Sequence, residues 1–291
     1  MTEQNLLEQR LQNHYASQNL GDRILSALEG AGKDLHNLQP ADLAPVDEFH
    51  VRGRKATMEL ARAAGLGPGM NVLDVGSGIG GPSRCIAAEF GCRVTGIDLT
   101  NEYCLAAQML AEKVGLSHLV TYRQGDAQKI SHPDETFDVV WTQHTAMNIP
   151  DKDLLYREMY RVLKPGGTLA IYDVLAGPAE PVHFPVPWSL GPETSFLATP
   201  DQLRTLLETA GFAITTWQDS TWEALTWFRN LTNPARTTAE RPLGIHIVMG
   251  DGFPSMTRNL LRNLEENRVV LYQVTAAKQV SGLKPQQAVN G

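Results

Sequence analysis

The sequence is short of cysteine, has no long apolar run and carries no basic stripe. Its three cysteines, Cys85, Cys92 and Cys104, form no C-x-x-C pair, so neither a zinc site nor a disulfide framework is indicated, and no metal is expected. No stretch approaches the roughly 18 apolar residues of a membrane-spanning helix, and the N-terminal segment is too polar for a signal peptide. A net charge of −7 argues against nucleic acid as a partner. We therefore expect a cytoplasmic protein.

What is present is a regular alternation of strand-like and helix-like segments from residue 70 onward. The expected strands are 71–76, 93–99, 120–126, 137–144, 166–175, 212–221 and 269–279. The expected helices between and after them are 81–90, 101–115, 151–163, 199–211 and 254–268. Strands that alternate with helices of about 10–15 residues indicate βαβ units and a mostly parallel sheet, so the predicted fold class is α/β.

The segments outside this alternation suggest three further regions. Apolar residues recur at helical spacing within 2–31 and precede a proline-containing loop at 37–50, so 1–55 is predicted to be an N-terminal helical cap. Residues 56–280, which contain the alternating strands and helices, are predicted to form the main domain. Residues 281–291 are expected to be a frayed tail. Residues 176–198 contain five prolines and three large aromatic side chains, which predicts an ordered lid over the site.

A glycine-rich turn follows the first strand of the main domain. In "VLDVGSGIGG" the spacing of Gly76, Gly78 and Gly81 is G-x-G-x-x-G, and a helix follows. Glycine lets a ligand approach the backbone, and a helix N-terminus offers unpaired N–H groups. The motif alone fits a dinucleotide or another ligand at that strand end. The residues that follow the neighbouring strands are needed to distinguish a dinucleotide from another ligand.

The motifs LDVGSGIGG, GIDL, GDAQ, FDVVWTQHTAMNI and RVLKPGGTLAIYD occur in this order across residues 70–174. Together they resemble the class I S-adenosylmethionine-dependent methyltransferases. The resemblance implies a Rossmann-like seven-stranded sheet of order 3-2-1-4-5-7-6 with an antiparallel strand 7. It argues against a nicotinamide oxidoreductase, because Asp126 and "LKPGG" are not explained by a dinucleotide site.

The resemblance also implies which residues contact the cofactor, S-adenosylmethionine. Asp98 would hold both ribose hydroxyls, since a carboxylate accepts two hydrogen bonds. Asp126 and Ala127 would lie near the adenine amino group, with Leu99 on the adenine face, and Asp74 would reach the amino group of the cofactor or order the loop. The turn residues Gly76, Ser77 and Gly78 would lie along the methionine part and the ribose, and Gln143 and His144 beside the methionine and the methyl group.

The methyl acceptor must be inferred from the inserts, which carry the specificity of a fold. The layout resembles the sarcosine/dimethylglycine subgroup and is also similar to tocopherol and phosphoethanolamine methyltransferases. His144 is the candidate base, and Arg52 and Arg54 would face one side of an extended segment as a clamp for a carboxylate. Further candidate acceptor contacts are Tyr15, His50, His183, Trp188 and His246.

Three functions remain open at this point. The first is methyl transfer to a small amine of the sarcosine or dimethylglycine kind. The second is C-, O- or S-methylation of an apolar small molecule such as a prenyl-type substrate, which the aromatic residues after position 180 would suit. The third is a protein that binds the cofactor without turnover. A homodimer is compatible with the aromatic lid, and a lid folded on its own monomer is equally so.

Overall fold

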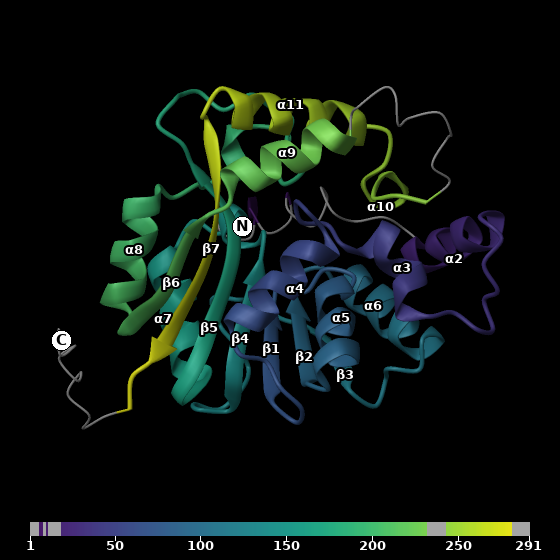
Figure 1. Ribbon diagram of the computed structural model, residues 1–291, viewed down its shortest axis with the longest axis horizontal. Coiled ribbons are helices and arrows are strands. Elements are labelled where there is room, and N and C mark those ends of the chain that lie inside the picture. The colour runs from purple at the N-terminus through teal and green to yellow at the C-terminus, as the bar shows by residue number, and fades with distance from the viewer. Residues whose placement is uncertain (1–5, 8–9, 11–18, 232–242, 281–291) are drawn as a thin grey trace, which may run out of the picture.

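One seven-stranded sheet crosses the molecule, with strand order β3-β2-β1-β4-β5-β7-β6 (Figure 1). The computed structural model describes residues 6–7, 10, 19–231 and 243–280. The strands β1 to β5 pair in parallel, and β7 runs antiparallel to both of its neighbours. This confirms the predicted α/β sheet. The strands are β1 (Asn71–Val75), β2 (Arg93–Asp98), β3 (Val120–Gln124), β4 (Phe137–Gln143), β5 (Leu163–Ala176), β6 (Phe212–Asp219) and β7 (Val269–Lys278).

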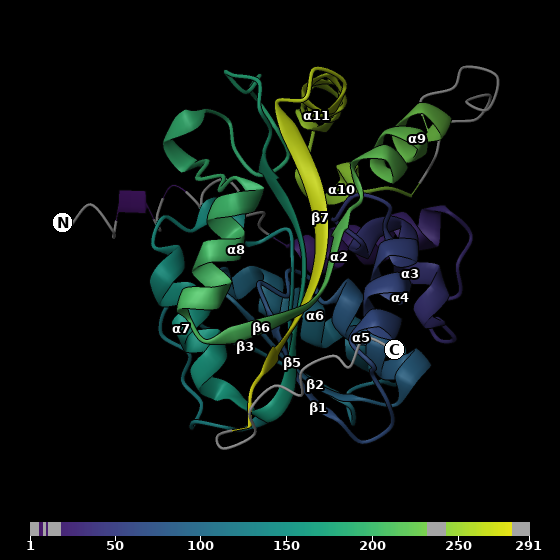
Figure 2. The same cartoon turned by 60° about the vertical axis from the view of Figure 1, so that its left-hand side comes forward.

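Helices cover both faces of the sheet and its upper end. Figure 2 shows α7 and α8 on one face and α4 and α5 on the other, and both views place α9, α10 and α11 above the sheet. The helices are α2 (Leu20–Gly30), α3 (Pro40–Asp47), α4 (Arg54–Ala63), α5 (Gly81–Phe90), α6 (Asn101–Lys113), α7 (Lys152–Val162), α8 (Pro200–Thr209), α9 (Thr221–Leu231), α10 (His246–Met249) and α11 (Phe253–Glu265), with short 3-10 turns η1 (Ala146–Asn148) and η2 (Pro192–Thr194).

The central strands are apolar on both sides because both of their faces are covered. Val72 packs into the core under α4, α5 and α6, whereas Leu73 and Val75 pack into the core under α7 and α8. Successive side chains of a strand point to opposite faces, so a strand buried on both faces contains a continuous apolar run. This is the physical reason that "NVLDV" predicted a strand.

The N-terminal region differs from the prediction between residues 40 and 47. The expected loop at 37–50 contains the helix α3, which begins with Pro40 in its first turn. Proline is tolerated there because the first N–H groups of a helix have no partner within the helix. The backbone N–H of Gln39 donates to Asp42 Oδ2 at 2.9 Å and completes a capping box. Pro40 is therefore compatible with a helix start, whereas Pro45 lies inside this short helix; the loop interpretation was wrong there.

Three further differences are local. The helix α9 was not predicted, although Asp219 caps it by accepting from the Thr221 N–H at 2.8 Å. The strand β5 already begins at Leu163. The extended backbone predicted around Arg52 is also wrong, because Arg52 has a φ of 69° and α4 starts at Arg54. A left-handed residue turns the chain, so the side chains of residues 52 and 54 do not share one side.

Within the described ranges, no helix combines the length and the apolar character that crossing a bilayer requires.

A buried ion pair joins the N-terminal helices to the sheet domain. Arg84 of α5 and Asp47 at the end of α3 are both almost fully buried, and Arg84 Nη2 lies 2.8 Å from Asp47 Oδ2. Arg84 Nη1 also donates to the carbonyl oxygens of Ile79 at 2.8 Å and Ala107 at 3.2 Å. Burying a charge is costly unless it is paired and hydrogen-bonded. The pair therefore holds α3 against the glycine turn.

We predict that Asp47→Ala lowers the free energy of unfolding by about 3–5 kcal/mol, because it leaves the Arg84 charge buried without its partner. The double variant Asp47→Leu/Arg84→Met should recover part of this loss. Glu265→Ala, which breaks an exposed pair with Arg229, is the control and should cost less than about 1 kcal/mol. Urea denaturation measures all three, and equal losses for Asp47→Ala and Glu265→Ala would contradict the prediction.

Candidate active site

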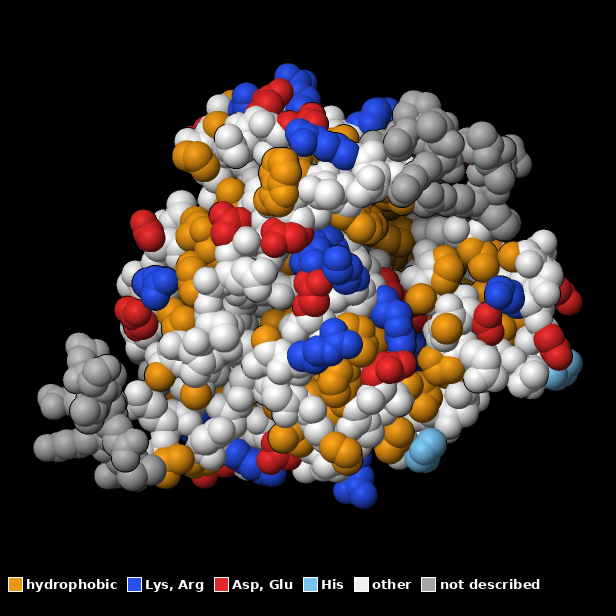
Figure 3. Space-filling model, in the orientation of Figure 1, with side chains coloured by type: hydrophobic (Ala, Val, Ile, Leu, Met, Phe, Trp, Pro, Cys, Tyr) orange, Lys and Arg blue, Asp and Glu red, His pale blue; other side chains and the backbone are white. Residues whose placement is uncertain are grey.

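A cavity of about 1660 Å³ opens at the carboxyl ends of the parallel strands. Its floor is formed by the segments that follow β1, β2, β3 and β4, and its roof by the lid and by α9, α10 and α11. Figure 3 shows a hollow lined by hydrophobic side chains between this upper part and the side that carries α2 and α3. Carboxyl ends of parallel strands are the usual ligand site of open α/β sheets.

Two glycines of the turn after β1 are required for different reasons. Gly76 has a φ of 74°, and a Cβ there would lie 2.2 Å from Thr145 Oγ1, so the protein itself excludes a side chain. At Gly78, with a φ of 53°, the nearest atom to such a Cβ is Phe49 Cδ2 at 3.5 Å. Gly78 therefore leaves its backbone open to the cavity, whereas Gly76 makes room for the loop after β4.

Asp98 ends β2 and faces the same turn. Its Oδ2 accepts from the Gly78 N–H and its Oδ1 from the Thr100 N–H, each at 2.9 Å. Burial raises the pKa of this half-buried carboxyl, and the two N–H groups oppose that rise. Each oxygen keeps a lone pair for a ligand. Asp98 thus orders the turn and still presents a bidentate acceptor to the cavity.

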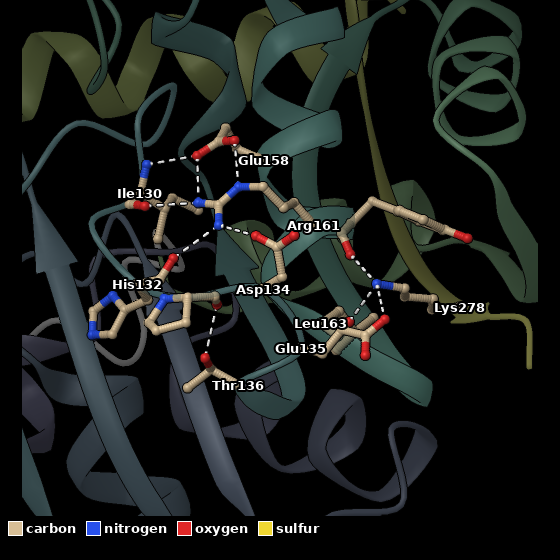
Figure 4. A network of polar contacts seen from close by, with 11 residues as sticks. Ile130, His132, Asp134, Glu135, Thr136, Glu158, Arg161, Leu163 and Lys278 are labelled. Atoms are coloured by element: carbon tan, nitrogen blue, oxygen red, sulfur yellow. Dashed lines mark hydrogen bonds and ion pairs between the residues drawn. The ribbon is translucent and has the colours of Figure 1, made fainter.

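The loop after β3 carries Asp126 and Ala127 along the cavity wall. Asp126 Oδ1 accepts from the Gln128 N–H at 2.8 Å, which closes a tight turn. Figure 4 shows how the rest of this loop is anchored: Arg161 of α7 reaches across to it. The Arg161 guanidinium donates to the carbonyl oxygens of Ile130 and His132, each at 2.8 Å, and to Asp134 Oδ1 at 2.7 Å.

Glu158 completes this anchor from the same helix. It binds the Arg161 guanidinium and accepts from the Ile130 N–H at 2.9 Å. The two charges hold the pKa of Glu158 below and that of Arg161 above their ordinary values, chiefly through the hydrogen bonds between them. The chain from 130 to 134 is therefore fixed to α7 on the side away from the cavity.

A cluster of polar side chains lies where the cap meets the end of β4. Thr57 Oγ1 donates to Glu48 Oε2 at 3.0 Å and lies 3.0 Å from His50 Nε2. His50 Nε2 also lies 2.9 Å from the carbonyl oxygen of Gly53, which assigns the proton to Nε2. Glu48, His50 and Gln143 are all buried and line the cavity. Burial lowers the pKa of His50 to about 4 and raises that of Glu48 to about 8.

His144 follows Gln143 and lies in a left-handed conformation with a φ of 51°. Its ring packs edge-on against Tyr172 with a centroid distance of 4.9 Å. Both ring nitrogens are buried, and neither has a hydrogen-bond partner among the described residues. Burial lowers its pKa well below the ordinary value, so the imidazole is neutral at neutral pH. A neutral imidazole with an unsatisfied acceptor nitrogen can take a proton from a ligand in the cavity.

Most of the residues predicted from the sequence meet at this cavity. Those that line it are Gly76, Ser77, Gly78, Asp98, Leu99, Asp126, Ala127, Gln143, His144, His50, Trp188 and His246. Their individual roles stay predictions. Tyr15 lies outside the described residues.

Asp74 is placed beneath the glycine turn and is not part of the cavity wall. Its Oδ2 accepts from Ser83 Oγ, and the side chain is buried. Burial raises its pKa to about 7. This position corresponds to the second of its two predicted roles, the ordering of the loop.

The predicted arginine clamp is not assembled. Arg52 is buried and pairs with Glu59, and Arg54 pairs with Glu89 at 2.6 Å on the outer side. Neither arginine lines the cavity. The reason is the turn at Arg52, which directs the two side chains to different partners.

The lid after β5 is held down by its own polar contacts. His183 lies outside the cavity wall and binds Glu266 through Nε2 at 2.8 Å, while its backbone exchanges two hydrogen bonds with the Asn263 side chain. Trp188 is 1 % exposed and donates through Nε1 to Ser195 Oγ at 2.9 Å. His183 therefore fixes the lid to α11, and Trp188 both packs the lid and forms cavity wall.

Sequence reasoning missed Glu48 and the part of the apolar roof that α9 contributes. Glu48 lies in a segment that looked like a polar loop, and only the folding of α3 brings it to the cavity. The helix α9 does have a local signal, because Ala224 and Phe228 are apolar, lie four residues apart and are both buried; of these two, Phe228 lines the cavity.

We predict that Arg161→Met loosens the loop at 130–134, because a charged donor to three acceptors is lost. Amide hydrogen exchange of this loop should become at least about tenfold faster, and S-adenosylhomocysteine should bind more weakly. Arg157→Met on the same helix is the control, since the one hydrogen bond that Arg157 makes to the described residues goes to the Asp153 carbonyl within α7. Unchanged exchange in Arg161→Met would refute the anchoring role.

Part of the chain is similar to known methyltransferases. Residues 73–171 match the methyltransferase domain family. A sterol 24-C-methyltransferase of Gibberella zeae is 44% identical over 117 residues, which cover 40% of this chain and 30% of that enzyme. Phosphoethanolamine N-methyltransferase 3 of Arabidopsis thaliana is 40% identical over 129 residues, 44% of this chain and 26% of that enzyme. The matched part is thus under a third of either relative's length.

One solved structure covers nearly the whole chain. A geranyl diphosphate C-methyltransferase from Streptomyces coelicolor superposes with a TM-score of 0.66 at 16% identity, over 94% of this chain and 98% of that one. At such low identity the likeness concerns the fold. The comparisons do not single out the sarcosine/dimethylglycine subgroup. Residues 73–171 thus match a methyltransferase domain, and the observed strand order is the one that the sequence motifs implied.

Proposed function

We propose that the protein transfers a methyl group from S-adenosylmethionine to a bulky, largely apolar small molecule. The observation that carries this proposal is the apolar half of the cavity, which lies beyond the residues expected to hold the cofactor. A pocket for one drug-sized ligand usually measures roughly 300–1,000 Å³. A cavity of about 1660 Å³ has room for the cofactor and a second large molecule.

The residues on the cavity floor suit S-adenosylmethionine. Asp98 offers two acceptor oxygens for the ribose, and the Asp126–Ala127 turn lies at the end of the next strand for the adenine. Ser77 Oγ and Gln143 Nε2 are buried polar atoms of the wall without a partner among the described residues, as expected where a polar ligand supplies one. When bound, the cofactor supplies a methyl group activated on a sulfonium.

The acceptor half of the cavity is built mainly from large apolar side chains. The contributors from the roof and the lid are Trp188, Phe196, Trp227, Phe228, Leu243, Ile245, Met249, Phe253 and Leu260. Apolar surface of this kind stabilises an apolar ligand by about 25 cal/mol per Å² removed from water. The sterol and geranyl diphosphate enzymes among the similar proteins act on molecules with large apolar parts, which supports the same class of acceptor.

A small amine of the sarcosine kind, the first expectation from the sequence, is less well supported. Its carboxylate needs a cationic partner, and both candidate arginines pair with Glu59 and Glu89 away from the cavity. A molecule of a few heavy atoms would also leave most of the apolar wall in contact with water. The phosphoethanolamine methyltransferase similarity keeps an amine as the second candidate.

His144 is proposed to take the proton that the acceptor releases. It lies at the end of β4 on the cavity wall and is neutral at neutral pH. Its unpaired ring nitrogens leave one acceptor and one donor for the ligand. The cavity would hold the acceptor atom near the methyl group, and this proximity is a large part of the rate advantage for such a reaction.

The proposal is tested by methyl transfer from labelled S-adenosylmethionine to acceptors of graded size. The set contains sterol-like and prenyl-type molecules, apolar alcohols and amines, and small amines such as sarcosine. We expect the highest kcat/KM with a bulky apolar acceptor. A matched pair of variants on α11 sharpens the test: Thr257 lines the cavity, whereas its neighbour Arg258 is exposed and does not line it.

Thr257→Trp should lower kcat/KM for bulky acceptors about tenfold or more by filling the space that they occupy, with little change in S-adenosylhomocysteine affinity. Arg258→Trp should leave both quantities unchanged. Fastest transfer to sarcosine-sized amines, with bulky acceptors inert, would refute the proposed acceptor class.

A second prediction concerns His144. His144→Asn keeps a residue that tolerates the left-handed backbone but removes the base, so kcat should fall by about 10²–10⁴. S-adenosylhomocysteine affinity should change little. With saturating cofactor and acceptor, kcat of the wild type should fall as the pH falls through the lowered pKa of His144, so this loss should lie below pH 6.5. An unchanged kcat in His144→Asn would exclude the base role.

A further inference from the structure

The cavity wall contains one buried acid that the roles above leave unexplained. Glu48 is 5% exposed, and no arginine or lysine of the described segments forms an ion pair with it. Its neighbour Asp47 is neutralised by Arg84, whereas Glu48 accepts a hydrogen bond from Thr57 and, among the described residues, has only the neutral His50 ring nearby, with Nε2 at 3.4 Å from its Oε2. A buried carboxylate is costly unless a cation or further donors meet it. Its place on the cavity wall suggests that a ligand supplies them.

The order of the strands indicates which end of the cofactor Glu48 meets. Asp126 follows β3, Asp98 ends β2, the glycine turn follows β1, and Gln143 ends β4, and these four strands are consecutive neighbours in the sheet. A cofactor with its adenine over β3 and its ribose over β2 therefore extends across β1 towards β4. Its amino-acid end, with an ammonium and a carboxylate, comes to lie on the β4 side.

Glu48 lies on that side of the turn. A Cβ on Gly81 would be 2.0 Å from the Asp47 carbonyl oxygen, and one on Gly78 would be 3.5 Å from Phe49, so the segment 47–49 presses against the glycine turn. Thr57, which donates to Glu48, also approaches Gln143 Oε1 at 3.4 Å. Glu48 and the Gln143 amide are thus neighbours in one polar cluster.

The Gln143 amide complements this acid. Trp141 Nε1 is a donor only, and it lies 3.1 Å from Gln143 Oε1, so the oxygen of the amide is assigned to that side. This leaves Nε2 as a buried donor without a partner in the described part of the structure. An acceptor such as a carboxylate would satisfy it.

The remaining acids of the wall have other partners or places. Asp98 and Asp126 lie at the ribose and adenine side, Asp151 caps α7 by accepting from the Leu154 N–H at 2.9 Å, and Glu193 belongs to the lid. Asp74 is beneath the turn, where Ser83 donates to it. We propose that Glu48 binds the α-ammonium of the amino-acid end of S-adenosylmethionine, with Gln143 Nε2 as the donor to the α-carboxylate. This rests on the cofactor assignment of the proposed function.

The test compares two ligands that differ only at this end of the molecule. S-adenosylhomocysteine carries the amino acid, and 5′-methylthioadenosine lacks it while keeping adenine, ribose and sulfur. Calorimetry with the full chain should show that Glu48→Gln weakens S-adenosylhomocysteine about ten- to hundredfold and changes the affinity for 5′-methylthioadenosine less than about threefold. Glu89→Gln, on the outer surface, is the control and should change neither.

The variant is expected to fold, because burial raises the pKa of Glu48 to about 8 and the neutral form that glutamine mimics is already favoured without ligand. Should Glu48→Gln not fold, Glu48→Asp keeps the charge but shortens its reach, and it should weaken S-adenosylhomocysteine selectively in the same way. In the wild type, a deaminated analogue of S-adenosylhomocysteine should bind about ten- to hundredfold more weakly, and in Glu48→Gln this difference should disappear.

The outcomes separate this inference from the proposed function. If the wild type binds neither ligand, both fail. If the wild type binds both, the inference alone is overturned by a variant that weakens both ligands equally or neither of them. It is also overturned if Glu48→Gln retains S-adenosylhomocysteine affinity and lowers kcat/KM for the acceptor, because Glu48 would then act on the acceptor.

Discussion

The guanidinium of Arg84 is the contact on which the arrangement of the site depends. It binds Asp47 at the end of α3, the carbonyl oxygen of Ile79 in the glycine turn, and that of Ala107 in α6. A charge buried this deeply must keep its partners. The N-terminal cap therefore has one position against the sheet domain, and this position places Glu48 and His50 on the cavity wall.

The cavity that results has two chemically different halves. Over β1 to β4 it offers carboxylates, backbone N–H groups and unpaired side-chain donors, which suit a polar ligand. Beneath α9, α10 and α11 it offers aromatic and aliphatic side chains. His144 lies at the end of β4, and burial keeps it neutral. In the proposed function, desolvation of this region serves two purposes: it favours an apolar acceptor, and it keeps His144 neutral so that it can act as a base.

The sheet was predictable because its signals are local. Each buried strand is a short apolar run, and each helix has apolar residues at helical spacing, so the strands and helices could be located from the sequence. The order of the strands came from the resemblance of the motifs to a known family. The errors arose where tertiary contacts override local preference. Proline at the start of α3 looked like a loop signal, and the left-handed turn at Arg52 could not be read from the residue type, since arginine rarely adopts it.

The sequence motifs alone determined that Asp98, Asp126 and the glycine turn meet at one edge of the sheet. Asp98, Asp126 and the glycine turn follow consecutive strands, so their meeting at one edge follows from the sheet order alone. Only the tertiary structure decided the rest. Whether Arg52 and Arg54 form a clamp, whether Asp74 faces ligand or protein, and whether Glu48 reaches the cavity depend on which partners come within hydrogen-bond distance. Those partners are far away in the sequence, and the burial that sets their charge states exists only after the cap and the roof have closed over the sheet.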